Sequence, residues 1–165
     1  MSISIRNVED KDAPAVHEIL TSQHVVEGTM RLKYMPPETT HTRIQPEPGK
    51  YKLVAEIENK VVGFAELITH PDLPRHAHVG EINMICVRAD HQGKGVARAL
   101  FQEMIDLAER WLGIHRLGLV VWENNKRAIK TYEKYGFEIE GTMRDYVLID
   151  GKWVNAVVMG RLRPE

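Results

Sequence analysis

A predicted strand, a turn that contains two glycines and the start of a helix follow one another in the middle of the chain. The strand is an apolar run from Gly80 to Val87, and the turn reads A-D-H-Q-G-K-G-V over residues 89–96. Glycine lets the backbone approach a ligand closely, and the first N–H groups of a helix have no partner within the helix. This order therefore predicts an anion site suited to a phosphate or a pyrophosphate.

The spelling of the turn excludes two common nucleotide motifs. A nucleotide P-loop needs Ser or Thr after Gly-Lys, whereas Lys94 is followed by Gly95. A dinucleotide turn of the form G-x-G-x-x-G needs a third glycine, but Arg98 stands at that position. The pattern that does fit is Q-x-x-G-x-A, formed by Gln92, Gly95 and Ala97.

A second motif follows about thirty residues later. Residues 125–137 read N-K-R-A-I-K-T-Y-E-K-Y-G-F, and a strand-like run from Leu117 to Val121 separates them from the turn. Together, Q-x-x-G-x-A and the later N-x-x-A…Y-x-x-x-G-F resemble the acyl-CoA loop and the following helix of the GCN5-related N-acetyltransferase (GNAT) superfamily. The resemblance covers residues 51–162, and the first fifty residues match only loosely.

The resemblance implies one domain over residues 1–165 with an α/β fold. Its sheet is expected to be mixed and mainly antiparallel, with splayed central strands and flanking helices. The pattern of apolar and polar residues along the chain agrees with this fold. It predicts strands at 4–8, 51–57, 61–68, 80–87, 117–121, 137–148 and 152–162, and helices after Asp10 or Asp12, at 38–44, at 95–112 and at 126–135. Residues 21–37 give no clear pattern.

The resemblance also implies acetyl-CoA as the acetyl donor. The backbone N–H groups of residues 93–98 are expected to hold its pyrophosphate, and the strand end at 85–87 its pantetheine arm. Asn125 is expected to reach that arm or to cap the next helix, since Asn suits both roles. The full set of implied binding residues is Ile85, Cys86, Val87, Gln92, Gly93, Lys94, Gly95, Val96, Ala97, Arg98, Asn125, Ala128 and Tyr132.

Two residues are candidates for catalysis. Tyr132 matches the tyrosine that protonates the departing thiolate in many relatives, and a phenol with a pKa of about 10 can donate at neutral pH. Packing between helix and sheet is the other role for this ring. Glu81 is the candidate general base, although it stands one residue early for the family pattern. A β-bulge would either absorb that shift or turn Glu81 away from the site.

Composition excludes several other classes of protein. A formal net charge of −1 lacks the electrostatic footprint of a nucleic-acid binder. The single cysteine, Cys86, cannot form an internal disulfide and lies in an apolar strand, so we expect a buried packing residue. No apolar run approaches about 18 residues, and a secretory leader is lacking, which predicts a cytoplasmic protein without membrane partners.

Histidines gather in the segment from Thr69 to His78. His70, His76 and His78 raise the question of zinc, but they lack a cysteine partner, and Pro71 and Pro74 interrupt the run. We expect a solvated loop and no metal site.

The acceptor pocket is the least constrained part of this superfamily. By analogy it forms from residues 24–44, from the loop at 69–78 and from the final hairpin. The first of these has an apolar bias, with Glu27 and Arg31 as possible charge partners. Core packing accounts for the apolar residues equally well; these are Val25, Met30, Leu32, Tyr34 and Met35.

The expected reaction is transfer of the acetyl group to the primary amine of a small molecule. The C-terminal segment resembles both L-amino-acid and spermidine acetyltransferases of bacteria. A polyamine site needs several carboxylates, but residues 24–44 contain only Glu27 and Glu38, which favours an L-amino acid. A polyamine, a protein N-terminus or lysine, and a non-catalytic role as a CoA sensor remain as alternatives. A homodimer is a family-based expectation.

Overall fold

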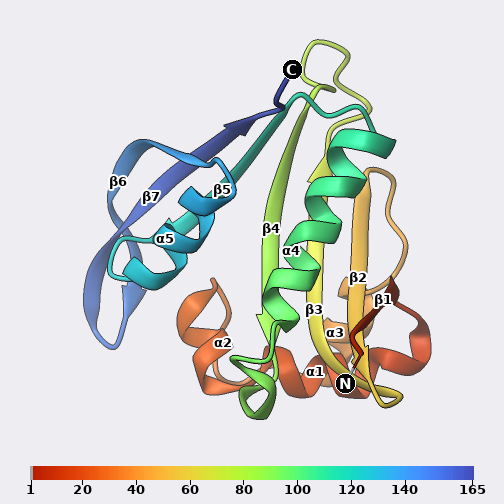
Figure 1. Cartoon of the computed structure of the whole chain (residues 1–165). Coiled ribbons are helices and arrows are strands. Elements are labelled where there is room, and N and C mark those ends of the chain that lie inside the picture. Colours follow the sequence, from red (N-terminus) through yellow and green to blue (C-terminus); the bar gives the residue numbers. More distant parts are fainter. Residues whose placement is uncertain (1) are drawn as a thin grey trace.

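The computed structural model describes residues 2–165. Figure 1 shows their course. The strands are β1 (Ser4–Asn7), β2 (Lys50–Ile57), β3 (Lys60–Thr69), β4 (Val79–Val87), β5 (Arg116–Trp122), β6 (Glu138–Ile149) and β7 (Lys152–Leu162). The α-helices are α1 (Ala13–Leu20), α2 (Gln23–Gly28), α3 (Pro37–Arg43), α4 (Val96–Asp106) and α5 (Lys126–Lys134). Short helical turns span Asp10–Asp12, Ala89–His91 and Leu107–Trp111.

All seven strands form one sheet in the order β1-β2-β3-β4-β5-β7-β6. Only the β4–β5 pair is parallel, which confirms the mixed, mainly antiparallel sheet predicted from the sequence. The main core lies between the sheet and the helices α4 and α5. A second core lies on the opposite face, beneath α1, α2 and α3 (Figure 1). Helices therefore cover both faces of the sheet.

Two tight turns set the pairing of β2 with β3 and of β6 with β7. Glu58 and Asn59 join β2 to β3 with φ angles of 50° and 63°, and Asp150 and Gly151 join β6 to β7 with 49° and 72°. Positive φ at both central residues is the signature of a type I′ turn, whose twist matches that of the flanking strands. Both predicted hairpins are confirmed.

Strand β4 is interrupted by a β-bulge in its middle. Its pairing with β3 steps from Ile82 directly to Met84, so Asn83 is an extra residue. The parallel pairing with β5 ends just before this point, at Glu81 and Gly118. Because a bulge bends and twists its strand, β4 and β5 diverge beyond it, as Figure 1 shows. The splayed central strands implied by the family resemblance are confirmed.

Helix α4 packs as its sequence spacing predicts, up to its last turn. Val96, Leu100 and Met104 are fully buried against the sheet. The helix then continues as a π-turn, closed by the Leu112 N–H donating to the Leu107 carbonyl at 3.0 Å. The wider turn rotates the following face outward, so that Trp111, which lies within the predicted helix at 95–112, is 77% exposed.

The N-terminal region contains a helix that the sequence pattern did not predict. α2 has six residues and buries only Val25, which leaves almost no periodic signal. The flanking helices α1 and α3 match their predicted positions, with Asp12 at the start of α1 and Pro14 in its first turn. Within residues 2–165, no helix combines the length and apolar character needed to cross a bilayer.

Candidate active site

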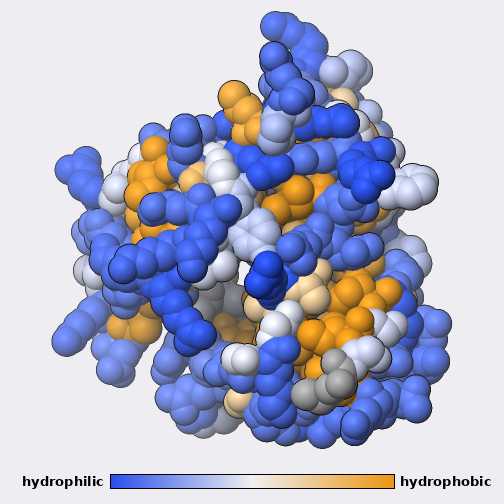
Figure 2. All heavy atoms as spheres, in the orientation of Figure 1, coloured by the Kyte–Doolittle hydropathy of each residue, from blue (hydrophilic) through white to orange (hydrophobic). Residues whose placement is uncertain are grey.

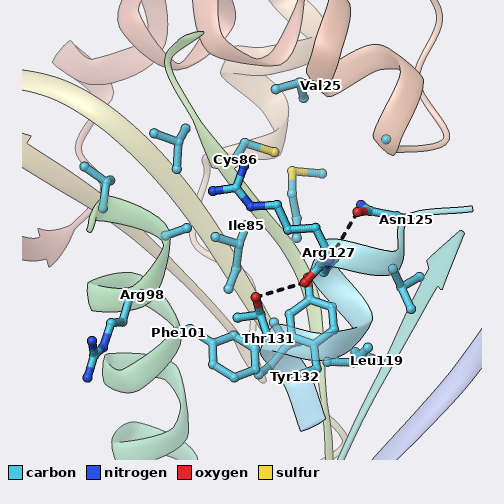
Figure 3. A pocket seen from close by; sticks show the side chains of 18 of the residues that line it. Val25, Ile85, Cys86, Arg98, Phe101, Leu119, Asn125, Arg127, Thr131 and Tyr132 are labelled. Atoms are coloured by element: carbon cyan, nitrogen blue, oxygen red, sulfur yellow. Dashed lines mark hydrogen bonds between the residues drawn. The ribbon is translucent and has the colours of Figure 1, made fainter. Parts of the chain in front are cut away.

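A cavity of about 580 Å³ opens between the diverging ends of β4 and β5. Its walls come from α2, β4, the turn before α4, the start of α4, β5 and α5. Figure 2 shows the hollow near the middle of this face, and Figure 3 shows the side chains around it. The two sequence motifs therefore meet at one cavity, although they lie about thirty residues apart.

The glycine turn forms one end of the cavity. Gly93 and Gly95 adopt φ angles of 76° and 86°, which L side chains rarely tolerate. Gly95 is the N-cap of α4, so the first N–H groups of this helix point out of the turn. Gln92, Ala97 and Arg98 also line the cavity. A helix start with free N–H groups beside a cavity is suited to a pyrophosphate.

Among residues 91–98, Lys94 is the one that the cavity lining does not include. Its side chain is exposed. Its contact with the cofactor stays a prediction, and from the surface Lys94 contributes its positive charge beside the cavity.

The splayed end of β4 forms the floor of the cavity. Ile85, Cys86 and Val87 all line it, beyond the last residue of β4 that pairs with β5. The backbone groups on that side of β4 are thus open to an extended ligand, which can bind as an added strand. Cys86 is 4% exposed, and burial raises the pKa of its thiol to about 12. Cys86 is a packing residue, as predicted.

Helix α5 supplies the opposite wall of the cavity. The Asn125 side chain accepts a hydrogen bond from the Ala128 N–H at 3.2 Å, which confirms its role as helix cap, and both residues also line the cavity. The ring of Tyr132 stacks on Phe101 with centroids 5.2 Å apart (Figure 3). Burial raises the pKa of Tyr132 above its ordinary value near 10, so the phenol keeps its proton at neutral pH.

Glu81 lies outside the cavity lining. It belongs to the part of β4 that still pairs with β5, before the bulge at Asn83. Its carboxylate lies 3.4 Å from the His70 ring and is about half exposed. The bulge thus leaves Glu81 away from the cavity instead of absorbing the one-residue shift.

The histidine loop lies close to Glu81. His70, His76 and Glu81 each place a potential metal ligand atom within 4.8 Å of the others. His76 and His78 are exposed, as a solvated loop predicts, whereas His70 is half-buried. The loop at 69–78 and the final hairpin do not contribute to the cavity lining, although both were predicted to form the acceptor pocket.

Several cavity residues had no signal in the sequence motifs. Asn83 and Met84 reach the cavity because of the bulge, which depends on pairing with β3. Others come from α4, β5 and α5, where the alternation of buried and exposed positions locates them only once the sheet order is known. They include Phe101, Leu119, Val121, Trp122, Arg127, Thr131 and Tyr135. From the predicted acceptor region, His24, Val25, Gly28 and Thr29 line the cavity.

A polar cluster lies behind the bulge, on the face covered by α1, α2 and α3. Glu66 of β3 is 3% exposed and accepts a hydrogen bond from the Asn83 amide at 2.8 Å. Arg43 of α3 approaches both of its carboxylate oxygens at 3.5 Å. A carboxylate in the middle of an apolar strand gave no functional signal in the sequence, and its partners come from distant segments.

Comparison with known proteins agrees with this geometry. Residues 13–137 match the acetyltransferase (GNAT) family. The chain is 37% identical to the L-amino acid N-acetyltransferase AaaT of Escherichia coli K12, over 98% of both chains. It is 26% identical to the spermidine N(1)-acetyltransferase of the same strain, over 96% of this chain and 84% of the relative.

Solved structures share the fold over nearly the whole chain. The spermidine N-acetyltransferase of Vibrio cholerae, crystallised with CoA and spermine, superposes with a TM-score of 0.85 at 25% identity. The match covers 97% of this chain and 95% of that protein. The glycine turn, the open edge of β4 and the buried tyrosine all fit acetyl-CoA as the acetyl donor. This chain belongs to the GNAT family of acetyltransferases and is an acetyl-CoA-dependent N-acetyltransferase.

Proposed function

We propose that the acceptor is the α-amine of an L-amino acid. One observation carries this proposal: none of the cavity-lining residues, among the residues 2–165 that the structure describes, is Asp or Glu. A polyamine keeps several ammonium groups charged and needs carboxylates to replace their hydration. The lining instead combines apolar side chains with neutral polar groups, two histidines and two arginines, Arg98 and Arg127, which suits a small acceptor with an apolar side chain and an anionic group.

The comparison with relatives supports the same choice. The L-amino acid N-acetyltransferase is more similar to this chain than the spermidine enzyme of the same organism, at 37% against 26% identity. The amine chemistry differs between these acceptors. The α-amino group of a peptide has a pKa of about 8 and a primary alkyl amine one near 10.4, and the α-amine of a free amino acid lies between these values, so it is neutral more often than a polyamine at neutral pH.

The reaction that we propose is direct attack of the neutral amine on the thioester carbonyl. A C–N bond forms as the C–S bond breaks, and the amine proton leaves to water. Backbone N–H groups near Ile85–Val87 are placed to stabilise the oxyanion that develops. The Tyr132 hydroxyl gives its proton to the departing thiolate and regains one from solvent.

No side chain of the cavity lining is required as a strong base in this scheme. Glu81, the residue predicted for that role, lies outside the lining and faces His70. In this scheme solvent takes the proton of the amine. We therefore expect Glu81→Gln to keep nearly wild-type turnover, and a loss of more than about tenfold would return Glu81 to the mechanism.

The test is a thiol-release assay with acetyl-CoA and three classes of acceptor. L-leucine and L-methionine represent amino acids, spermidine represents polyamines, and a short peptide with a free N-terminus represents proteins. Turnover with the amino acids supports the proposal. Turnover with spermidine or the peptide alone overturns it, and acetyl-CoA binding without any transfer favours a CoA sensor.

We also propose that the chain forms a homodimer through the hairpin of β6 and β7. β6 is an edge strand of the sheet. Large apolar side chains on this hairpin are exposed, among them Ile139 at 54%, Leu148 at 57% and Trp153 at 65%. Light scattering tests this proposal: a mass of twice 18.9 kDa supports it, and a monomer at 18.9 kDa refutes it.

A further inference from the structure

Arg31 lies in the irregular segment between α2 and α3, and its guanidinium has no carboxylate partner in the part of the chain that the structure describes, residues 2–165. Its Nε atom is completely buried and meets no hydrogen-bond acceptor among residues 2–165. Its two terminal nitrogens face the sulfur atoms of Met35 and Met84, each at 3.7 Å. A thioether is a weak acceptor. A charged group is thus partly buried, and its Nε has no hydrogen-bond acceptor in the described part of the chain.

The neighbouring charges do not neutralise Arg31. Glu66 is the nearby buried carboxylate, but it is engaged by Arg43 and by the Asn83 amide. Arg31 and Arg43 together therefore bring two positive charges against one negative charge. Burial, followed by repulsion from Arg43, lowers the pKa of Arg31 below its ordinary value. An anion bound here would be stabilised, because the buried part of the guanidinium is already desolvated when the protein folds and loses no further hydration on binding.

The position of Arg31 connects it to the active-site cavity. Met84, whose sulfur touches the guanidinium, is part of the cavity lining. Gly28 and Thr29, which precede Arg31 by three and two residues, also line the cavity. The guanidinium therefore lies directly behind the wall formed by the bulged part of β4 and the end of α2.

We propose that Arg31 binds the carboxylate of the acceptor amino acid and so selects amino acids over other amines. The planar fork of a guanidinium matches a carboxylate, with Nε and one terminal nitrogen donating side by side. A rotation of the flexible Met84 side chain opens the path from the cavity. This inference rests on the proposed function, because it names the group that recognises an amino acid.

The experiment compares two acceptors that differ only in the group that Arg31 would bind. L-leucine carries a carboxylate, whereas L-leucinamide keeps the same side chain and has an α-amine of lower pKa. This pKa difference is the same for every variant, so the effect of Arg31 is read from the change in the leucine-to-leucinamide ratio. We expect the wild type to prefer leucine. Arg31→Gln should lower kcat/KM for leucine about 10- to 100-fold more than for leucinamide, the loss expected for hydrogen bonds to a charged group. The preference of Arg31→Lys for leucine over leucinamide should lie between that of the wild type and that of Arg31→Gln.

Lys33→Gln is the matched control, since it removes a positive charge from an exposed position in the same segment. It should leave the preference for leucine unchanged. Equal losses on both acceptors in Arg31→Gln would overturn the proposal while leaving the amino-acid acceptor in place. Wild-type turnover with spermidine alone would overturn the proposed function itself, so that the two failures are distinguishable.

The stability of Arg31→Met provides a second readout. Methionine fills a similar volume without the unpaired charge, so the variant should unfold at a higher temperature than the wild type while losing the preference for leucine. Such a gain is expected of a residue kept for binding. A lower unfolding temperature, combined with equal losses on both acceptors, would show that Arg31 serves the fold and would refute the proposal.

Discussion

Gly63 of β3 links the packing of α4 to the acetyl-CoA site. A Cβ atom at this position would lie 2.9 Å from side-chain carbons of Val96 and Leu100 and 3.3 Å from Ala55. Carbon atoms in contact prefer a separation of about 3.5–4.0 Å, so the side chains of Val96 and Leu100 must shift by several tenths of an ångström, and we expect the start of the helix to move with them. Val96 is the first residue of α4, and this movement displaces the N–H groups of the glycine turn.

The magnitude of the effect of Gly63→Ala follows from these contacts. Overpacking a buried site by one methyl group costs about 1–3 kcal/mol, which corresponds to a fall in Tm of roughly 2–12 °C for a chain of this size. Weakening one hydrogen bond to the pyrophosphate costs about 0.5–1.5 kcal/mol. We therefore expect the KM for acetyl-CoA to rise about 2- to 10-fold.

Thermal unfolding and the KM for acetyl-CoA are the two measurements for this variant. Gly141→Ala is the matched control, because Gly141 also lies in a strand, has an ordinary φ, and has no atom within 4 Å of an added Cβ. The control should keep the wild-type Tm and KM. The proposed link between Gly63 and the acetyl-CoA site is refuted if the two variants have the same Tm and the same KM for acetyl-CoA. It is also refuted if Gly63→Ala loses stability without any change in KM.

Three further changes test other parts of the site and the fold. Tyr132→Phe should lower kcat by about 100-fold or more while the calorimetric Kd for CoA changes little, whereas an unchanged kcat would end the assignment as general acid. Gly95→Ala places a side chain at a φ of 86°, so it should weaken CoA binding and cost about 1–3 kcal/mol in urea unfolding. Arg6 holds the pKa of Asp12 below its ordinary value near 3.8. The stabilisation from this pair is complete above that value and is lost as the pH falls. The urea midpoints of Asp12→Asn and the wild type should therefore differ by a constant amount above about pH 5 and converge as the pH falls below about 4.

Local signals in the sequence predicted much of the fold. The predicted helix at 95–112 contains α4, whose buried face carries Val96, Leu100 and Met104. The predicted strands at 137–148 and 152–162 left a short gap, which is the hairpin turn at Asp150 and Gly151. Such signals depend on residues close in the chain, so they are readable without knowledge of tertiary contacts. The same holds for the glycine turn and the cap at Asn125, where the local conformation itself creates the binding feature.

The features that the sequence did not predict depend on contacts between distant segments. The bulge at Asn83 exists only in relation to β3, and it decides which side chains of β4 face the cavity. It therefore also separates Glu81 from the site. The π-turn that exposes Trp111 is a choice of hydrogen-bond partner that helical spacing does not encode.

The charge environment of Arg31 also could not be predicted from the sequence. In the sequence Arg31 stands beside apolar residues and is ordinary for a loop. Only the structure shows that its Nε is buried without a partner while the nearby carboxylate of Glu66 is occupied by Arg43. The presence of a charge is visible in a sequence, but its compensation is a property of the fold.

The most direct test of the account is thiol release from acetyl-CoA with L-leucine, L-leucinamide and spermidine as parallel acceptors. If the acceptor is an L-amino acid, we expect turnover with L-leucine, weaker turnover with L-leucinamide and little or none with spermidine. Turnover with spermidine but not with L-leucine would contradict the assignment of the acceptor site.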